Sequence, residues 1–267
     1  KHGADPNIAS KTRDLVAEKK LVDAAREIQR DILDSFQEPT SSQVQAAILA
    51  ARELYLSGKV PEKRKNEPKE TGYRAGANSS RPLPVKKVGG LTPLLHAARQ
   101  GYSKAAIALI DGGADINQVN AADGTSPLLI AVINAQFDLA LQFLELGADP
   151  NLTDTVHNVA PLWAAVNAQW QPRTRFPQPQ EHGMQKTSYL DLVRALLNAE
   201  ADTDNRLTKH PWFMVYTGCG NGNCGLEETQ GSTAFWRAAY GTDVDAMQLL
   251  SEYDANTNIP TKAPAPR

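Results

Sequence analysis

Two cysteines and one nearby histidine are the side chains of this sequence with the clearest capacity for chemistry. Cys219 and Cys224 are the only cysteines in the chain, and they lie in a loop rich in Gly and Asn that follows His210. Such a loop can close on itself, so the spacing favours a disulfide over two free thiols. A metal site is the third alternative, although zinc would need further ligands beyond these three. A disulfide would indicate an oxidising compartment.

Motifs that reveal catalysis by their spacing are missing from the sequence. It contains no His-Glu-x-x-His, no phosphate-binding glycine loop, no Cys-x-x-Cys-His and no Gly-x-Ser-x-Gly. Among the histidines, His96 falls within a predicted helix, where packing or a hydrogen bond is the commoner role. We therefore expect neither an enzyme nor a bound cofactor or metal. One alternative stays open, which is an enzyme with a metal near His210 and Cys219.

Aromatic side chains in the C-terminal part give the best indication of a binding function. The four tryptophans are Trp163, Trp170, Trp212 and Trp236. Trp and Arg often dominate protein interfaces, so these residues favour a surface that contacts another protein. A second hypothesis is a small-ligand or polysaccharide binder that uses Trp170, Trp212 and Trp236 as stacking platforms. A third is structural, because loops bury their aromatic side chains where they can.

Charge and hydropathy restrict the remaining classes. The 267 residues, 29.0 kDa, carry a formal net charge of −2 and a mean hydropathy of −0.42. Residues 59–90 hold nine Lys and Arg against three Glu, a net charge of +6 that leaves −8 for the rest. A role with nucleic acid would have to depend on this segment, and we expect none. No apolar run approaches the roughly 20 residues that span a bilayer, so we expect no transmembrane segment.

The elements that must position these side chains are repeated. Gly113-Ala114-Asp115-Ile116-Asn117 returns as Gly147-Ala148-Asp149-Pro150-Asn151, at an offset of 34 residues. Thr92-Pro93-Leu94 returns at the same offset as Ser126-Pro127-Leu128 and then as Ala160-Pro161-Leu162. Degenerate copies are found at 199–204, 233–235 and 254–258, and a truncated copy, Gly3-Ala4-Asp5-Pro6-Asn7, opens the chain. A period of this length indicates a solenoid.

Local chemistry predicts a pair of helices in each repeat. Thr or Ser before Pro places a capping oxygen at the N-cap and a fixed φ at the first helical position. The first helix then has one apolar face, formed by Leu94, Ala97 and Ala98. A second helix is indicated by the helical spacing of Ala106, Leu109 and Ile110. One repeat alone leaves an apolar face open, so stability must come from stacked neighbours.

These motifs resemble the ankyrin repeat family. The resemblance implies an all-α ankyrin-repeat solenoid that acts as a non-catalytic protein-protein interaction scaffold, or as a subunit of a larger assembly. In that family the inner helices and hairpin tips form a concave binding surface. Together with the aromatic and cationic residues of the insertions, it maps here onto Arg99, Gln100, Asn134, Trp163, Asn167, Trp170, Arg173, Arg175, Trp212, Trp236 and Tyr240. The expected partner is another protein, and we expect this chain to bind no cofactor.

Long insertions narrow the resemblance to bacterial ankyrin proteins, many of them exported. We therefore expect a periplasmic or extracellular location, with the cytoplasm as the alternative. The predicted organisation is a truncated repeat at 1–9, a helical hairpin at 10–58, a basic Pro-rich loop at 59–88, repeats at 89–260 with insertions at 171–186 and 207–230, and a tail at 261–267. Within the hairpin, residues 12–36 and 41–57 are predicted helices, the second with a Thr40 and Gln43 capping box. Because the chain opens inside a repeat, we expect further residues or another chain to cover that end.

Overall fold

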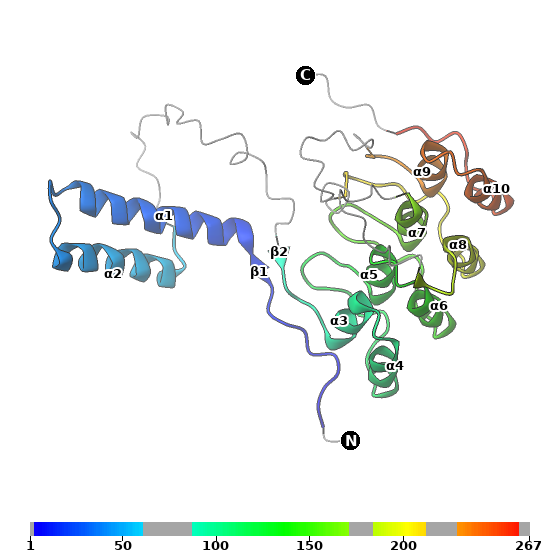
Figure 1. The fold of residues 1–267 in the computed structure, drawn as a ribbon, viewed down its shortest axis with the longest axis horizontal. Coiled ribbons are helices and arrows are strands. Elements are labelled where there is room, and N and C mark those ends of the chain that lie inside the picture. Colours follow the sequence, from blue (N-terminus) through cyan, green and yellow to red (C-terminus); the bar gives the residue numbers. More distant parts are fainter. Residues whose placement is uncertain (1–2, 61–86, 171–183, 212–228, 262–267) are drawn as a thin grey trace. The chain divides into compact units, whose positions relative to one another are not determined.

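The structure is a computed structural model that describes residues 3–60, 87–170, 184–211 and 229–261. These residues form ten α-helices and two strands of two residues each. They divide into two compact units (Figure 1), which are a hairpin unit, Arg13–Val88, and a repeat unit, Lys1–Thr12 with Gly89–Arg267. Among the helices described, none combines the length and apolar character needed to cross a membrane.

The described part of the hairpin unit contains two antiparallel strands and two helices. Strand β1, Arg13–Asp14, pairs with strand β2, Lys87–Val88, and the helices are α1, Leu15–Asp34, and α2, Ser41–Ser57. The Asp14 carboxylate accepts the backbone N–H groups of the first turn of α1, which fixes where that helix begins. The predicted capping box of Thr40 and Gln43 is present at the start of α2, and Gly58 ends α2 in the left-handed conformation.

The core of the hairpin unit is thin. Ala25 and Ala47 are its buried residues among those described, with exposed fractions of 8% and 0%. Their small side chains let α1 and α2 approach closely, while larger apolar residues remain half-buried along the contact. On α2, Leu49 and Leu56 are exposed. This unit therefore buries much less apolar surface than the repeat unit does.

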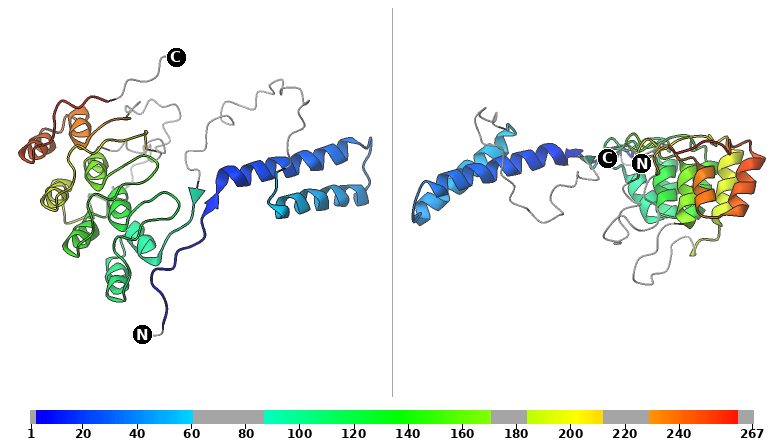
Figure 2. Two further views of the ribbon diagram at one scale, coloured as in Figure 1. Left: turned by 180° about the vertical axis from the view of Figure 1, so that it is seen from behind. Right: turned by 90° about the horizontal axis from the view of Figure 1, so that it is seen from above.

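In the described residues, the repeat unit contains four helix pairs. They are stacked in two layers (Figures 1 and 2). The inner layer contains α3, Pro93–Gln100, α5, Pro127–Ile133, α7, Pro161–Gln169, and α9, Ala234–Tyr240. The outer layer contains α4, Ser103–Asp111, α6, Phe137–Glu145, α8, Tyr189–Asn198, and α10, Val244–Glu252. Helices α3, α5 and α7 each contact the next inner helix, and every described inner helix contacts the outer helix of its own pair. Neighbouring pairs therefore bury each other's apolar faces.

The inner helices begin where the sequence predicts. The hydroxyl groups of Thr92, Ser126 and Thr233 accept the backbone N–H three residues later, at 3.2, 3.1 and 3.2 Å. Proline follows at the first position of α3, α5 and α7, where it removes no helical hydrogen bond. Helix α7 lacks the side-chain cap because Ala160 occupies that position.

A left-handed glycine joins the N-terminal segment to the first repeat. Gly89 has φ +89°, and a Cβ atom there would lie 2.1 Å from the carbonyl oxygen of Lys11. Ser10 donates its backbone N–H to Leu91 at 3.0 Å and accepts the N–H of Gly90 at 3.1 Å. Any larger residue at position 89 would therefore separate these two segments.

Candidate protein-binding face

Three aromatic side chains lie together at the ends of α7 and α9, and we call them the aromatic patch: Trp170, Trp236 and Tyr240. The Trp236 and Tyr240 rings stack with centroids 5.3 Å apart and planes 25° from parallel. The Trp170 indole lies over Gly241, where a Cβ atom would come within 3.0 to 3.1 Å of the ring. Tyr240 is 50% exposed and Trp170 is 38% exposed. The patch therefore presents apolar aromatic surface to solvent.

A single buried carboxylate holds the Trp170 ring in place. Asp243 accepts the indole N–H of Trp170 at 2.7 Å and the Tyr189 hydroxyl at 2.9 Å. Its other oxygen accepts the Ala246 N–H at 3.0 Å and so caps α10. Burial and the hydrogen bond to Asp243 raise the pKa of Tyr189, which keeps the phenol protonated as the donor. One residue thus connects α7, α8 and α10.

A buried arginine supports the patch from beneath. Arg237 on α9 is 1% exposed, and its Nε donates to the Asn167 side-chain oxygen at 2.8 Å. Its Nη2 donates to the Trp170 backbone carbonyl, also at 2.8 Å. Burial lowers the pKa of Arg237 to about 10, against the opposing effect of Tyr240 and Asp243, so the guanidinium remains charged at neutral pH. Nothing in the residue's own type or spacing indicates this role.

Two residues predicted to contact a partner are instead buried. Trp163 is 1% exposed and donates its indole N–H to Ser232 at 3.1 Å, while Asn167 is fully buried against Arg237. Both lie between successive helix pairs, so they belong to the core and support the surface from inside. The prediction overlooked that α9 covers this part of α7.

The other described candidates lie at the surface or close to it. Arg99 and Gln100 are exposed at the end of α3, and no ion pair is recorded for Arg99 among the described residues. Asn134 is half-buried, and its amide donates to the Ile130 carbonyl at 2.8 Å. These three residues share the C-terminal ends of the inner helices with Tyr240.

Several predicted site residues fall outside the described ranges: Arg173, Arg175, Trp212, Cys219 and Cys224. The disulfide therefore remains a prediction. His210 is described, and its Nδ1 lies 3.0 Å from the Thr229 hydroxyl. No group of three or more His, Cys, Asp or Glu side chains is placed to hold a metal ion in the part of the chain that the structure covers.

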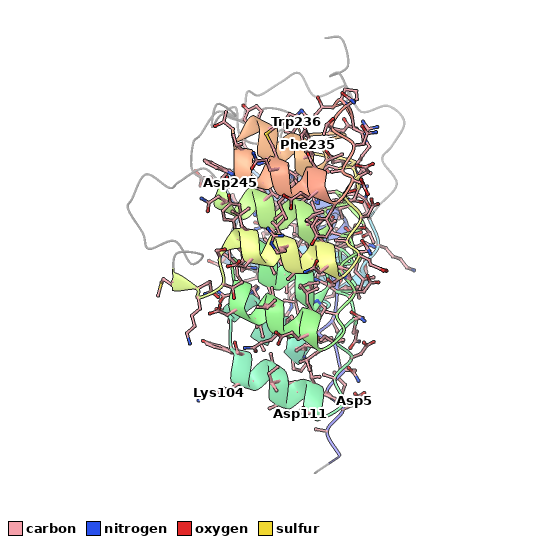
Figure 3. All side chains as sticks on the ribbon, turned by 90° about the vertical axis from the view of Figure 1, so that its right-hand side faces the viewer. Asp5, Lys104, Asp111, Phe235, Trp236 and Asp245 are labelled. Carbon is pink, nitrogen blue, oxygen red and sulfur yellow. The ribbon has the colours of Figure 1, made fainter. Side chains whose placement is uncertain are left out.

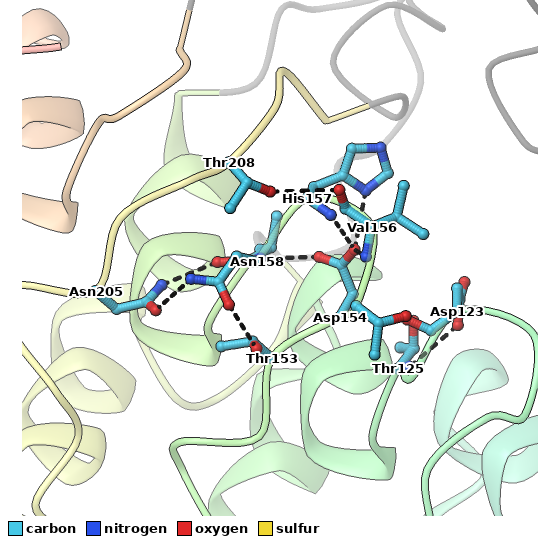
Figure 4. A network of polar contacts seen from close by, with 11 residues as sticks. Asp123, Thr125, Thr153, Asp154, Val156, His157, Asn158, Asn205 and Thr208 are labelled. Carbon is cyan, nitrogen blue, oxygen red and sulfur yellow. Dashed lines mark hydrogen bonds and ion pairs between the residues drawn. The ribbon is translucent and has the colours of Figure 1, made fainter. Parts of the chain in front are cut away.

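A buried polar network joins the loops between repeats (Figure 4). Asp154 accepts the backbone N–H groups of Val156, His157 and Val159 at 2.6 to 2.9 Å, and its Oδ1 lies 3.0 Å from the His157 Nδ1. The Thr208 N–H donates to the His157 carbonyl at 2.8 Å. His157 is thus a buried structural residue with 8% exposure.

This network predicts a pH dependence of stability. Burial raises the pKa of Asp154, but the hydrogen bonds from the His157 side chain and the Val159 and His157 amides outweigh it, so the pKa lies below its ordinary value. The carboxylate therefore stabilises the fold fully above its unfolded pKa, about 4, and loses this contribution as the pH falls through the folded pKa. Urea unfolding from pH 6 to 2 should show a smaller acid loss in Asp154→Asn than in the native chain. Asp111→Asn, at an exposed carboxylate, is the control, and equal slopes in all three proteins would contradict the prediction.

In the described residues, stacked helix pairs with Asx hairpins between them form an all-α repeat solenoid, which fits ankyrin repeats. In agreement, a family model described as "Ankyrin repeats (3 copies)" matches residues 72–154. Ankyrin repeats generally mediate protein-protein interactions and are generally non-enzymatic. No curated protein matches the chain significantly.

Proposed function

We propose that this chain is a non-catalytic interaction scaffold, or a subunit of a larger assembly, and that it binds another protein through the exposed ends of the inner helices. The observation that carries the proposal is the aromatic patch. Its rings are half-exposed, yet the Arg237 and Asp243 hydrogen bonds fix the residues around them. A rigid aromatic surface loses little conformational entropy on association, which is the usual property of an interface hot spot.

The arginines among the candidate contact residues favour a partner with acidic and apolar character. Arg99 is exposed on the same layer, and the expected contact residues Arg173 and Arg175 follow Trp170 in the sequence. We further propose an exported location with a Cys219–Cys224 disulfide, in keeping with the narrower resemblance of the sequence.

The test is capture of the partner by the full-length chain, with quantified cross-linking and mass spectrometry. Tyr240→Ala should reduce recovery of a specific partner at least tenfold, because Tyr240 is half-exposed and makes no recorded side-chain hydrogen bond among the described residues. Tyr102→Ala removes another exposed aromatic ring, 64% exposed at the start of α4, and should leave recovery unchanged. Equal recovery in both variants would contradict the proposed face. Quenching of tryptophan fluorescence by a glycan panel would favour the polysaccharide hypothesis instead.

A further inference from the structure

The last helix pair has an apolar face that no other described helix covers, and this face corresponds to buried faces in the earlier pairs. The second and third residues after the N-cap are at most 1% exposed in α3, α5 and α7. They are Leu94, Leu95, Leu128, Leu129, Leu162 and Trp163. The equivalents in α9, Phe235 and Trp236, are only half-buried. On the outer layer, Val193 is fully buried, whereas its equivalent Met247 is half-buried.

Phe235 and Met247 line an open groove at one end of the stack. It has a volume of about 540 Å³ and is lined by Phe235, Val244, Met247, Gln248, Ser251 and Glu252. Val244 is 60% exposed. Figure 3 shows Phe235, Trp236 and Asp245 at this end and Lys104, Asp111 and Asp5 at the opposite end. An apolar centre with a polar rim is the composition of a protein interface.

A second, independent feature lies on the hairpins. In each hairpin an Asx side chain accepts a backbone N–H from the next hairpin: Asn7 from Asp115 at 2.8 Å, Asn117 from Asp149 at 2.9 Å, Asn151 from Asp202 at 2.7 Å, and Asp204 from Asn256 at 2.9 Å. The asparagines Asn7 and Asn151 also donate to the carbonyl two residues before that N–H, at 3.2 and 3.0 Å. Each such pair fixes the register of one repeat against the next.

Asn258 occupies the same position in the last hairpin. Its backbone N–H donates to Asn256 at 3.0 Å, as the equivalent residues do in the other hairpins. Its side-chain amide has no recorded hydrogen-bond partner among the described residues. The amide can therefore accept a backbone N–H and donate to the carbonyl two residues before it. Asn7 binds the Asp115 N–H and the Gly113 carbonyl in this way.

We propose that the outer face of α9 and α10, together with Asn258, is a docking surface for one further ankyrin-type repeat presented by a partner. Its helix pair fills the groove, and its hairpin pairs with the Asn258 amide in the register of the internal repeats. This surface shares Trp236 with the aromatic patch, but Phe235, Val244, Met247 and Asn258 lie outside that patch, so the inference does not depend on the proposed function. The continuity of both features with the internal repeat contacts, rather than the exposed apolar area alone, specifies the occupant.

The first experiment supplies such a repeat to the full chain. A second copy of residues 87–117, which contains the Gly113 and Asp115 partners of Asn7, is joined after Thr261 in place of residues 262–267. Hydrogen exchange should show the added segment protected as a folded repeat. Asn258→Ala in this extended chain should lower that protection by about tenfold, as the loss of two modest hydrogen bonds implies. Thr257→Ala, at the exposed neighbouring residue, should not change it.

Two results would overturn the proposal. One is an added segment that exchanges like unfolded chain while the rest stays protected, and the other is an extended chain that Asn258→Ala leaves unchanged. The second experiment is sedimentation equilibrium of the unaltered chain across concentrations. Self-association that Val244→Asp abolishes would support the surface and identify a second copy as the source of the repeat. Self-association that is indifferent to Val244→Asp would contradict the assigned surface.

Discussion

Replacing Arg237 with alanine should lower the free energy of unfolding by about 3 kcal/mol, the combined effect of two unsatisfied acceptors and a small cavity. The guanidinium satisfies the buried Asn167 side-chain oxygen and the partly buried Trp170 carbonyl, both at 2.8 Å. Alanine leaves both oxygens without a donor. Urea denaturation, with an unchanged m-value as the sign of an unchanged unfolding reaction, measures the difference.

Two further variants test whether the stabilisation requires the two separate donors of the Arg237 guanidinium. Arg237→Lys retains the charge but presents a point donor, so it should recover only part of the loss. Arg194→Ala removes an exposed arginine whose nearest carboxylate, that of Glu252, is 4.0 Å away, and it should change stability by less than about 0.5 kcal/mol. If the Arg237→Ala variant proved as stable as the native chain, these two hydrogen bonds would provide no net stabilisation. Partner capture by Arg237→Ala should also fall, because the Trp170 backbone loses its anchor.

Trp163→Ala should destabilise the repeat unit by about 3 to 5 kcal/mol, the range for truncating a buried aromatic residue. Trp236→Ala provides a matched comparison, since both residues occupy the same position of an inner helix. Trp163 is 1% exposed between α7 and α9, whereas Trp236 is half-buried at the end of the stack. The second substitution should therefore lower the free energy of unfolding by no more than about 2 kcal/mol, as its smaller buried area implies.

Thermal and urea unfolding of both variants measure this contrast. Ser232→Ala removes only the acceptor of the Trp163 indole N–H, at 3.1 Å, and should destabilise by about 1 kcal/mol. Similar losses for Trp163→Ala and Trp236→Ala would show that position in the stack does not govern the packing of these residues. That result would also weaken the inference that the last helix pair is uncovered.

The helix boundaries were predictable because they depend on neighbours in the sequence. Thr92 and Ser126 cap the amides three residues ahead, and the proline that follows each suits the first position of a helix but not its interior. The Thr40 and Gln43 capping box in the hairpin unit is another local arrangement that the sequence alone specifies. In each case the interacting groups lie within one helical turn, so the residue order contains all of the geometry.

The exposure of the residues in the proposed binding face was predictable only in part. Tyr240 and Trp170 were identified as surface aromatics, and both are partly exposed. Asp243 was missed, although it receives hydrogen bonds from Trp170 and Tyr189, because its partners lie 73 and 54 residues away. An aspartate before a helix suggests a cap, which Asp243 also is, and this local role hides the second one.

By itself, the sequence determined the repeat: its period, its helix starts and the Asx residues of its hairpins, all of which follow from short-range hydrogen bonding and apolar periodicity. Only the tertiary structure decided which copies of a repeated position are buried. Trp163 and Trp236 have equivalent places in the repeat, but α9 covers the first and no described helix covers the second. The physical reason is that burial in a solenoid depends on the adjacent repeat, which a residue's own repeat does not encode.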